Sequence, residues 1–144
     1  MNLLDTTKVK MLDYVVYHKA EKMGYAALNI NNLAIYTKKS TDGKKGSRIW
    51  LIAGEGKPRR YYLRASFLIS NVMHSDKPEF ISKITGTDGQ LFDPMPLLNG
   101  HAWMPDFVEE QGRFAFGFNK IKDEEVIKGL RQILVANTLR SMNG

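Results

Sequence analysis

Two strand-forming runs that are separated by a short break constrain the fold of this sequence most. Residues 48–53 gather isoleucine, leucine and alanine around Trp50, and residues 61–72 continue with aromatic and aliphatic side chains. β-branched and aromatic residues favour strands. The break at residues 54–58 holds two glycines and a proline, which favour a turn. The pattern therefore predicts a β-hairpin with basic residues at its ends.

Weaker strand signals surround this hairpin. Residues 13–17 and 80–85 are predicted strands, and the turn-rich residues 86–89 are expected to end the second one. Residues 28–36 predict an irregular crossing or a short strand, and residues 19–23 a single helical turn. Three prolines within residues 92–105 predict an extended loop without regular elements. The alternation of Phe114, Phe116 and Phe118 predicts a half-buried strand over residues 112–118.

A long helix signal comes after these strands. Asp123 is a candidate N-cap, and Glu124 and Glu125 give the first turn an acidic character. One apolar stripe follows at helical spacing, made of Val126, Ile127, Leu130, Ile133 and Leu134. Strands followed by a closing helix predict an α+β fold, in which a small curved sheet or β-barrel carries a C-terminal helix. The length of 144 residues and the lack of a linker predict one domain, residues 1–144.

The positive charge is concentrated in one part of the sequence. Residues 38–64 hold nine basic and two acidic residues, a net +7, whereas the remaining twelve basic and thirteen acidic residues sum to −1. Such a patch is typical of a surface that binds a polyanion through phosphate contacts. A loop that is simply kept soluble by its lysines is the alternative. The candidate nucleic-acid-binding residues are Lys38, Lys39, Lys44, Lys45, Arg48, Lys57, Arg59 and Arg60.

Several classes of protein are excluded or disfavoured. The chain contains no cysteine, which excludes disulfides, iron–sulfur clusters and thiolate zinc sites. No stretch approaches the roughly 20 apolar residues of a membrane span, and the first residues lack the layout of a secretory signal. A cytoplasmic protein that does not contact membranes is expected. The three histidines, His18, His74 and His101, are scattered, and we expect neither a metal site nor a cofactor.

One catalytic pattern requires comparison with the binding hypothesis. Asp42, Glu55 and Lys57 resemble the Asp…Glu-x-Lys arrangement of magnesium-dependent nucleases, in which two carboxylates hold the metal and the lysine orients water. Asp42, however, lies in a Gly/Lys-rich loop, which is a poor support for a metal ligand. A charged hairpin turn is the plainer interpretation. Residues 54–57 do not form a phosphate loop, because Leu51 stands where its first glycine belongs. We expect no catalytic residues.

The loop-borne Trp103 has two interpretations. It lies between Pro96 and Pro105, close in sequence to Asp93 and Asn99. An indole beside an amide and a carboxylate can stack on a flat base and read its edge. Alternatively, Trp103 plugs the open end of the sheet or barrel.

Four stretches of the sequence are together similar to a known type of module. They are YHKAEKMGY at residues 17–25, IWLIAGEG at 49–56, YYL at 61–63 and GRFAFGF at 112–118. The sequence thus resembles PUA-like domains of the EVE, YTH and ASCH type, including a bacterial module found alone or ahead of HNH nuclease domains. The resemblance extends from about residue 17 to residue 134. The chain itself has no His-Asn-His cluster or paired cysteines of an HNH nuclease.

The resemblance implies a small β-barrel with peripheral helices. Several such modules bind nucleic acid and take a modified base into an aromatic pocket. The base-pocket residues that we nominate here are Trp50, Tyr62, Asp93, Asn99 and Trp103.

The sequence therefore predicts a non-catalytic module that binds nucleic acid, DNA rather than RNA. It reads a modified or flipped base as the specificity part of a restriction or defence system, with an associated nuclease domain as a possible partner. The alternatives are the magnesium nuclease and a protein–protein adaptor that docks a partner on the C-terminal helix or the proline-rich loop.

Overall fold

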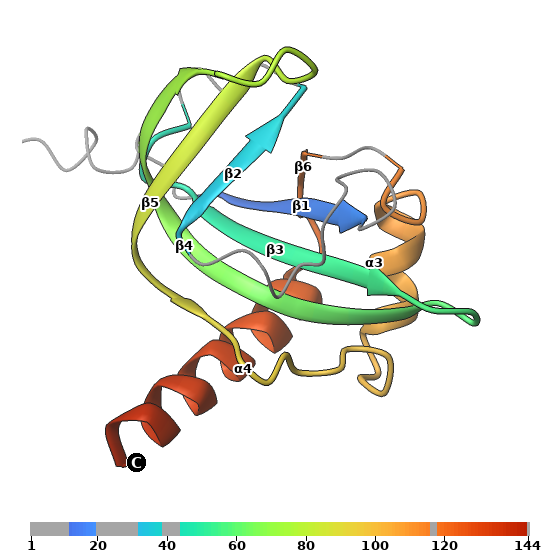
Figure 1. The fold of residues 1–144 in the computed structure, drawn as a ribbon. Helices are drawn as coiled ribbons and strands as arrows, with labels where there is room; N and C mark the ends of the chain where they lie inside the picture. Colours follow the sequence, from blue (N-terminus) through green and yellow to red (C-terminus); the bar gives the residue numbers. More distant parts are fainter. Residues whose placement is uncertain (1–11, 20–31, 39–43, 116–117, 144) are drawn as a thin grey trace, which may run out of the picture.

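The computed structural model describes residues 12–19, 32–38, 44–115 and 118–143. Figure 1 shows a strongly curled sheet with helices packed against it. The strands are β1 (Asp13–Lys19), β2 (Ala34–Thr37), β3 (Arg48–Glu55), β4 (Arg60–His74), β5 (Ser82–Leu91) and β6 (Asn119–Lys120). The helices are α3 (Met104–Glu110) and α4 (Glu124–Asn143). The predicted α+β class, with a curved sheet and a C-terminal helix, is confirmed.

The sheet has six strands in the order β2-β5-β4-β3-β1-β6. The predicted hairpin is present as the antiparallel pair of β3 and β4. β1 joins β3 in parallel, and the remaining pairs are antiparallel. The pairing of β4 with β3 shifts register between Leu51 and Ile52. The pairing of β4 with β5 shifts register at two places, between Ser66 and Leu68 and between Ile69 and Asn71. Such irregularities bend strands, and they occur where this sheet curls into a half-barrel.

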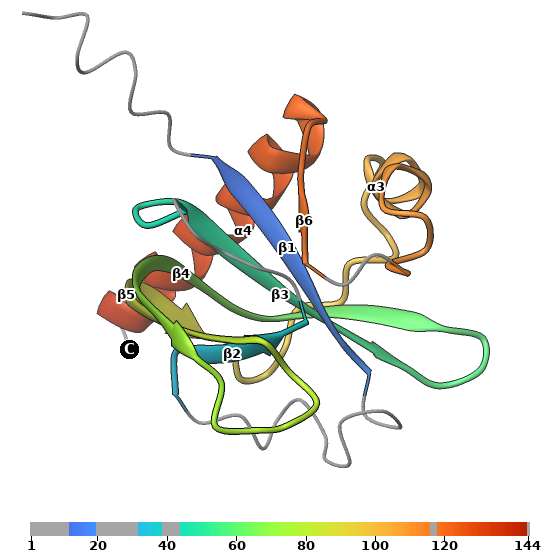
Figure 2. The same cartoon turned by 90° about the horizontal axis from the view of Figure 1, so that it is seen from above.

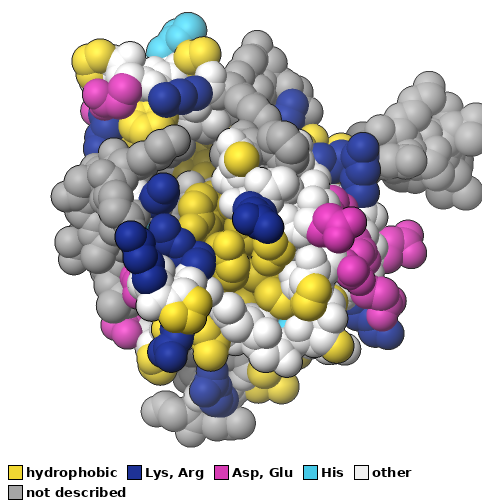
Figure 3. All heavy atoms as spheres, turned by 90° about the vertical axis from the view of Figure 1, so that its right-hand side faces the viewer, with side chains coloured by type: hydrophobic (Ala, Val, Ile, Leu, Met, Phe, Trp, Pro, Cys, Tyr) yellow, Lys and Arg dark blue, Asp and Glu magenta, His cyan; other side chains and the backbone are white. Residues whose placement is uncertain are grey.

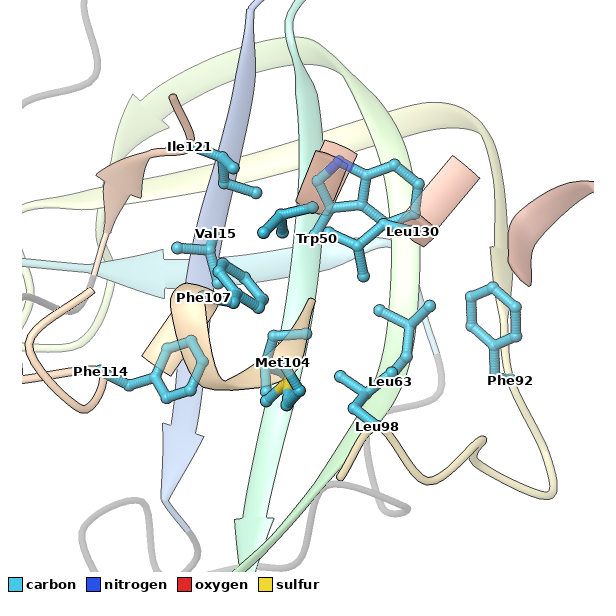
Figure 4. Packing of buried hydrophobic residues seen from close by; sticks show 12 residues of the cluster. Val15, Trp50, Leu63, Phe92, Leu98, Met104, Phe107, Phe114, Ile121 and Leu130 are labelled. Atoms are coloured by element: carbon cyan, nitrogen blue, oxygen red, sulfur yellow. The ribbon is translucent and has the colours of Figure 1, made fainter. Parts of the chain in front are cut away.

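The two faces of the sheet form two cores. The inner cluster brings Ile35 of β2 together with Tyr14 and Val16 of β1, although these strands lie at opposite sides of the sheet order. The sheet must therefore curl around this cluster. The outer cluster lies between the sheet and the helices, which are on the same side of the sheet in Figure 2. In Figure 4 its members, among them Trp50 and Phe107, converge from β3, α3 and their neighbours.

Helix α4 begins as the sequence predicted. The carboxylate of Asp123 accepts hydrogen bonds from the backbone N–H groups of Glu125 (2.9 Å) and Val126 (3.4 Å). Val126 and Leu130 are fully buried, and the rest of the predicted apolar stripe packs against the same outer cluster. The stripe therefore closes the protein's own core.

The predicted turn at residues 86–89 is wrong, because β5 continues through it to Leu91. A Cβ at Gly86 would overlap the ring of Phe67, and one at Gly89 would overlap the carbonyl oxygen of Ser66. The two glycines are therefore needed for close approach of β5 to β4. Asp88, with φ of 51°, marks a local irregularity in a strand that otherwise continues.

Two further predictions are wrong for physical reasons. The predicted loop at residues 92–105 runs into helix α3, because Pro105 occupies the first helical turn, where its missing N–H costs nothing. Residues 112–115 are turns, with φ of 55° to 64° at Gly112, Arg113 and Phe114. Phe114 packs in the outer cluster and Phe118 in the inner one, so their spacing does not reflect one strand face.

Some predictions fall outside the described residues. They are the helical turn beyond Lys19, the first part of the crossing at residues 28–36, Lys39, and residues 40–43 of the Gly/Lys-rich loop that holds Asp42. Among the helices that the structure describes, neither is long and apolar enough to cross a membrane.

Candidate nucleic-acid interface

The basic residues that are clustered in the sequence do not share one surface. Lys44 and Lys45 precede β3, whereas Lys57, Arg59 and Arg60 follow it. An eight-residue strand spans about 26 Å at roughly 3.3 Å per residue, so the two groups lie at opposite ends of β3. Lys38 is exposed directly after β2, and Lys39 is outside the described residues. The expectation of one continuous basic face therefore requires correction.

Arg48 is held by protein groups. Its Nη1 donates to the Ser66 hydroxyl at 3.0 Å and its Nη2 to the Asp88 carbonyl at 3.4 Å, while the guanidinium lies 5.9 Å from the Trp50 ring centre. Burial, followed by the nearby positive charge of Arg131, lowers the pKa of Arg48. Its side chain thus joins β3 to β4 and β5, which leaves it poorly placed for a phosphate.

The group before β3 is also partly used by the protein. Lys44 is half-buried, with its Nζ 5.5 Å from the centre of the Tyr14 ring. Its carbonyl accepts a hydrogen bond from the Ser47 N–H at 3.1 Å, which closes the turn into β3. Lys45 is exposed. This end of β3 therefore presents one exposed lysine and one that covers an aromatic ring.

The other end of β3 is a compact basic turn, which we call the hairpin end and define as residues 55–61. Lys57 and Arg60 are exposed and Arg59 is half-buried. Asn99 holds this turn: its Oδ1 accepts from the Tyr61 N–H at 2.7 Å, and its Nδ2 donates to the Arg59 carbonyl at 3.2 Å. The nominated amide of Asn99 is thereby engaged with backbone, and its position fixes the hairpin end.

Aromatic rings adjoin the hairpin end on the outer face of the sheet. Tyr17 stacks on Phe114 with ring centres 5.1 Å apart, and Tyr61 lies 5.0 Å from Phe114 and 6.2 Å from Tyr17. Tyr17 and Tyr61 are half-buried, whereas Phe114 is buried. Gly54 makes this packing possible, because a Cβ there would overlap the Tyr17 hydroxyl. Tyr17 and Tyr61 are therefore partly exposed on the outer face, whereas the side chain of Arg60, which shares a face with Tyr62, lies on the inner face at the same end of the sheet.

On the inner face, a row of residues crosses the same end of the sheet. Ala53 pairs with His18 of β1 and with Tyr62 of β4, so the three side chains share a face. By alternation this is the face of Leu51, which belongs to the inner cluster. Tyr62 is half-buried, and His18 is buried. The next pair outward, Glu55 and Arg60, adds one charge of each sign at the edge.

Figure 3 looks onto this end of the molecule and shows a hollow with an apolar floor. Lys and Arg side chains lie on one side of it, and Asp and Glu side chains gather at the opposite side. The acidic residues of α3 include the exposed Asp106 and Glu109. A polyanion that approaches this end is attracted on one side only, which favours one orientation.

The two nominated tryptophans are both built into the protein. Trp50 is fully buried, and its indole N–H donates to the Asp13 carboxylate at 2.7 Å. Trp103 is half-buried, stacks on His101 with ring centres 4.9 Å apart, and lies against Gly129 of α4, where a Cβ would overlap the indole. These contacts hold Trp103 between α3 and α4, and no contact of its ring with the open end of the sheet is seen among the described residues.

The remaining candidates are not brought together. Asp93 is exposed one residue after the buried Phe92. Glu55 ends β3 and Lys57 lies in the following turn, while their proposed partner Asp42 falls outside the described residues. Within the ranges that the structure describes, no three His, Cys, Asp or Glu side chains gather in a way that could hold a metal ion.

The site residues nominated from the sequence do not include Tyr17, Tyr61 or Phe114. The sequence does place Tyr61 directly after Arg59 and Arg60, and this combination of an aromatic ring with positive charge could have marked it as a binding residue. The approach of Tyr17 and Phe114 depends on the tertiary fold, because residues 17, 61 and 114 come from three separate segments.

The sequence matches no protein-family model, and a search of curated proteins finds no similar one.

Proposed function

We propose that this protein binds nucleic acid through the hairpin end. Lys57 and Arg60 are exposed there and contact phosphates, which supplies affinity without sequence preference. Tyr17 and Tyr61 offer partly exposed rings on the outer face at the same end of the sheet, and aromatic rings stack on bases of any sequence. The observation that carries the proposal is that exposed cations and half-buried tyrosines gather at one end of the sheet.

We further propose that the module is PUA-like and reads a modified or flipped base, with DNA as its preferred partner. The curled sheet with peripheral helices suits such a module. In this proposal the extruded base lies against Tyr62 on the inner face of the sheet, where the Glu55–Arg60 pair can hydrogen-bond to its edge. Trp50 and Trp103 are left out because their rings already pack within the protein.

A module of this kind serves as the specificity part of a restriction or defence system, and a separate nuclease would cut the DNA. Asn99 acts in this proposal as a positioning residue for the hairpin end, through its two hydrogen bonds to the backbone. Asp93 stays a candidate reader of the base edge.

The test is binding of an oligonucleotide panel, DNA and RNA, single- and double-stranded, plain and carrying modified cytosine or adenine, at two salt concentrations. We expect binding that weakens with salt, with one modified strand bound more tightly than its plain counterpart. Tyr62→Leu should then abolish that preference while leaving binding to the plain strand intact. Tyr36→Leu, which changes a half-buried tyrosine of β2 beside Asp76, is the matched control.

No binding to any member of the panel at low salt would refute the nucleic-acid proposal as a whole. Binding without preference for a modified base would retain the hairpin end and refute the base pocket. Plasmid cleavage in the presence of magnesium would instead support the nuclease alternative.

A further inference from the structure

Consecutive residues of β4 place one aromatic ring on each face of the sheet at the hairpin end. Tyr61 lies on the outer face, where it packs against the outer cluster, and Tyr62 shares the inner face with Ala53. Both rings are half-buried, so each keeps part of its surface in solvent. A ligand that contacts both rings must therefore reach both faces of the same strand.

The inner face gains a second apolar side chain from the proline-rich loop. Leu97 pairs with Tyr62 across an isolated antiparallel bridge, which puts the two side chains on one face. Its neighbour Leu98 is fully buried in the outer cluster, as alternation requires, and the Leu98 N–H donates to the Tyr61 carbonyl at 2.8 Å. Leu97 is nevertheless 46% exposed. The inner face therefore presents an apolar contact that the fold does not bury.

The outer face offers a matching contact at the same end of the sheet. The ring centres of Tyr17 and Tyr61 are 6.2 Å apart, and both rings pack on the buried Phe114. The exposed Lys57 and Arg60 lie in the hairpin end itself. In Figure 1 and Figure 2 the turn between β3 and β4 projects beyond the helices and the other strands. The hairpin end is therefore a projection with positive charge near its tip and partly exposed apolar side chains on both faces behind it.

We infer that the hairpin end separates the two strands of an opened duplex, an inference that rests on the proposed function. Bases of one strand lie against Tyr17 and Tyr61 on the outer face. Bases of the other strand lie against Leu97 on the inner face, since apolar side chains also insert beside unstacked bases. The faces of bases in an intact duplex are covered by the neighbouring base pairs, so only unpaired bases can stack on these rings. The substrate class is therefore a junction between double-stranded and single-stranded nucleic acid.

A fork fits this arrangement better than other forms of nucleic acid. One continuous strand would have to turn around the tip to reach both faces, whereas the two arms of a fork already diverge and each passes one face. An intact duplex could take the hairpin only in its major groove, where mainly hydrogen-bonding groups read the base edges. The opening has to be present already, because stacking on a few rings offsets the loss of only a few base pairs.

Fluorescence anisotropy of the full chain with DNA ligands of one duplex sequence tests the inference. The ligands are a blunt duplex, a fork with two non-complementary arms, the two duplexes that keep only the 3′ arm or only the 5′ arm, and a free single strand. We expect the fork to bind about tenfold more tightly than the blunt duplex, and more tightly than either single-armed duplex or the single strand.

Two variants assign the arms to the faces of the sheet. Tyr61→Leu removes a ring from the outer face and Leu97→Ser an apolar side chain from the inner face. Each should lower the affinity for one single-armed duplex by about fivefold and leave the other nearly unchanged, and the two variants should affect opposite arms. Val135→Ser, a similarly exposed change on α4, is the matched control for Leu97→Ser.

Wild-type protein that binds the fork no more tightly than the blunt duplex or the single strand would overturn the inference and leave the proposed function in place. Variants that both weaken the same single-armed duplex would also overturn it, because the two faces would then contact one strand. Absence of binding to every ligand would refute the proposed function itself. Thermal melting checks that each variant is folded, and Tyr17→Leu, which removes the other outer ring, replaces Tyr61→Leu if that variant is unfolded.

Discussion

At the scale of single residues, Asp13 shows how one buried carboxylate organises several elements. It is 3% exposed, accepts the indole N–H of Trp50 at 2.7 Å and pairs with Arg131 of α4 at 3.0 Å. Asp13 thus connects β1 to β3 and to the C-terminal helix. Leaving a buried N–H without an acceptor costs more free energy than an exposed ion pair contributes. The hydrogen bond of Asp13 with Trp50 should therefore matter more for stability than its ion pair with Arg131.

Asp13→Ala should lower the free energy of unfolding by about 1–3 kcal/mol, because the buried indole N–H of Trp50 loses its acceptor. Arg131→Ala should cost less than about 1 kcal/mol, because the side chain of Arg131 is 54% exposed and solvent screens the pair. Urea unfolding of the two variants measures the difference. An Arg131 variant that is as destabilised as the Asp13 variant would show that the ion pair dominates.

Gly129 offers a test of the contact between Trp103 and α4. At an exposed site within a helix, Gly→Ala stabilises by roughly 1 kcal/mol. Here the added Cβ would overlap the Trp103 indole, so Gly129→Ala should instead destabilise the protein by about 1–3 kcal/mol. Gly100→Ala is the control, because nothing lies within 4 Å of the added Cβ. Stabilisation of the Gly129 variant in urea would mean that Trp103 does not pack there.

The tryptophans also show what the sequence can tell about single residues. Their need for burial is predictable, since large rings anchor cores of this size. The partners are not predictable, because Asp13 lies 37 positions before Trp50 and Gly129 lies 26 positions after Trp103. The sequence alone therefore allows either tryptophan to line a base pocket, and only the long-range contacts show that both rings pack within the protein.

At the scale of elements, the strand and helix predictions are correct where neighbouring residues favour the same structure. They are wrong where a glycine or a proline can either break an element or form part of one. The β3–β4 hairpin and the Asp123 cap of α4 follow from turn chemistry and capping, which act locally. Gly86 and Gly89 have the composition of a turn but serve the close approach of β5 to Phe67 and Ser66 of β4. Pro105 is one of three prolines that predict a loop without regular structure, but it lies in the first turn of helix α3.

The hairpin end depends on a loop that is distant in sequence. Asn99→Ala removes both hydrogen bonds that hold residues 59–61, at about 0.5–1.5 kcal/mol each. We expect the amide of Tyr61 to lose protection from hydrogen exchange. Affinity for a plain oligonucleotide should fall severalfold while its salt dependence stays unchanged, since no charge is lost.

Gln132→Ala, an exposed change on α4 that alters no charge, is the control for this experiment. Unaltered protection of Tyr61 in the Asn99 variant would show that the strand pairing alone holds the hairpin end.

At the scale of the whole molecule, the distribution of charge is the property that the sequence conceals. Nine basic residues are close together in residues 38–64, but β3 carries Lys44 and Lys45 about 26 Å away from Lys57 and Arg60. Only the topology shows that Tyr17 of β1 lies beside Tyr61 of β4, at the same end of β3 as the second group. We therefore place the proposed binding at one end of β3.

The most direct measurement compares the salt dependence of binding for two variants that each lose two positive charges, Lys57→Ala/Arg60→Ala and Lys44→Ala/Lys45→Ala. Each phosphate contact contributes about 0.7–0.9 to the slope of log K against log salt concentration. We predict that the slope of the hairpin-end variant falls by about 1.5 and its affinity at least tenfold, while the other variant stays close to the wild type. Equal slopes for the two variants, or a larger loss for the Lys44/Lys45 variant, would contradict the assignment of the interface to the hairpin end.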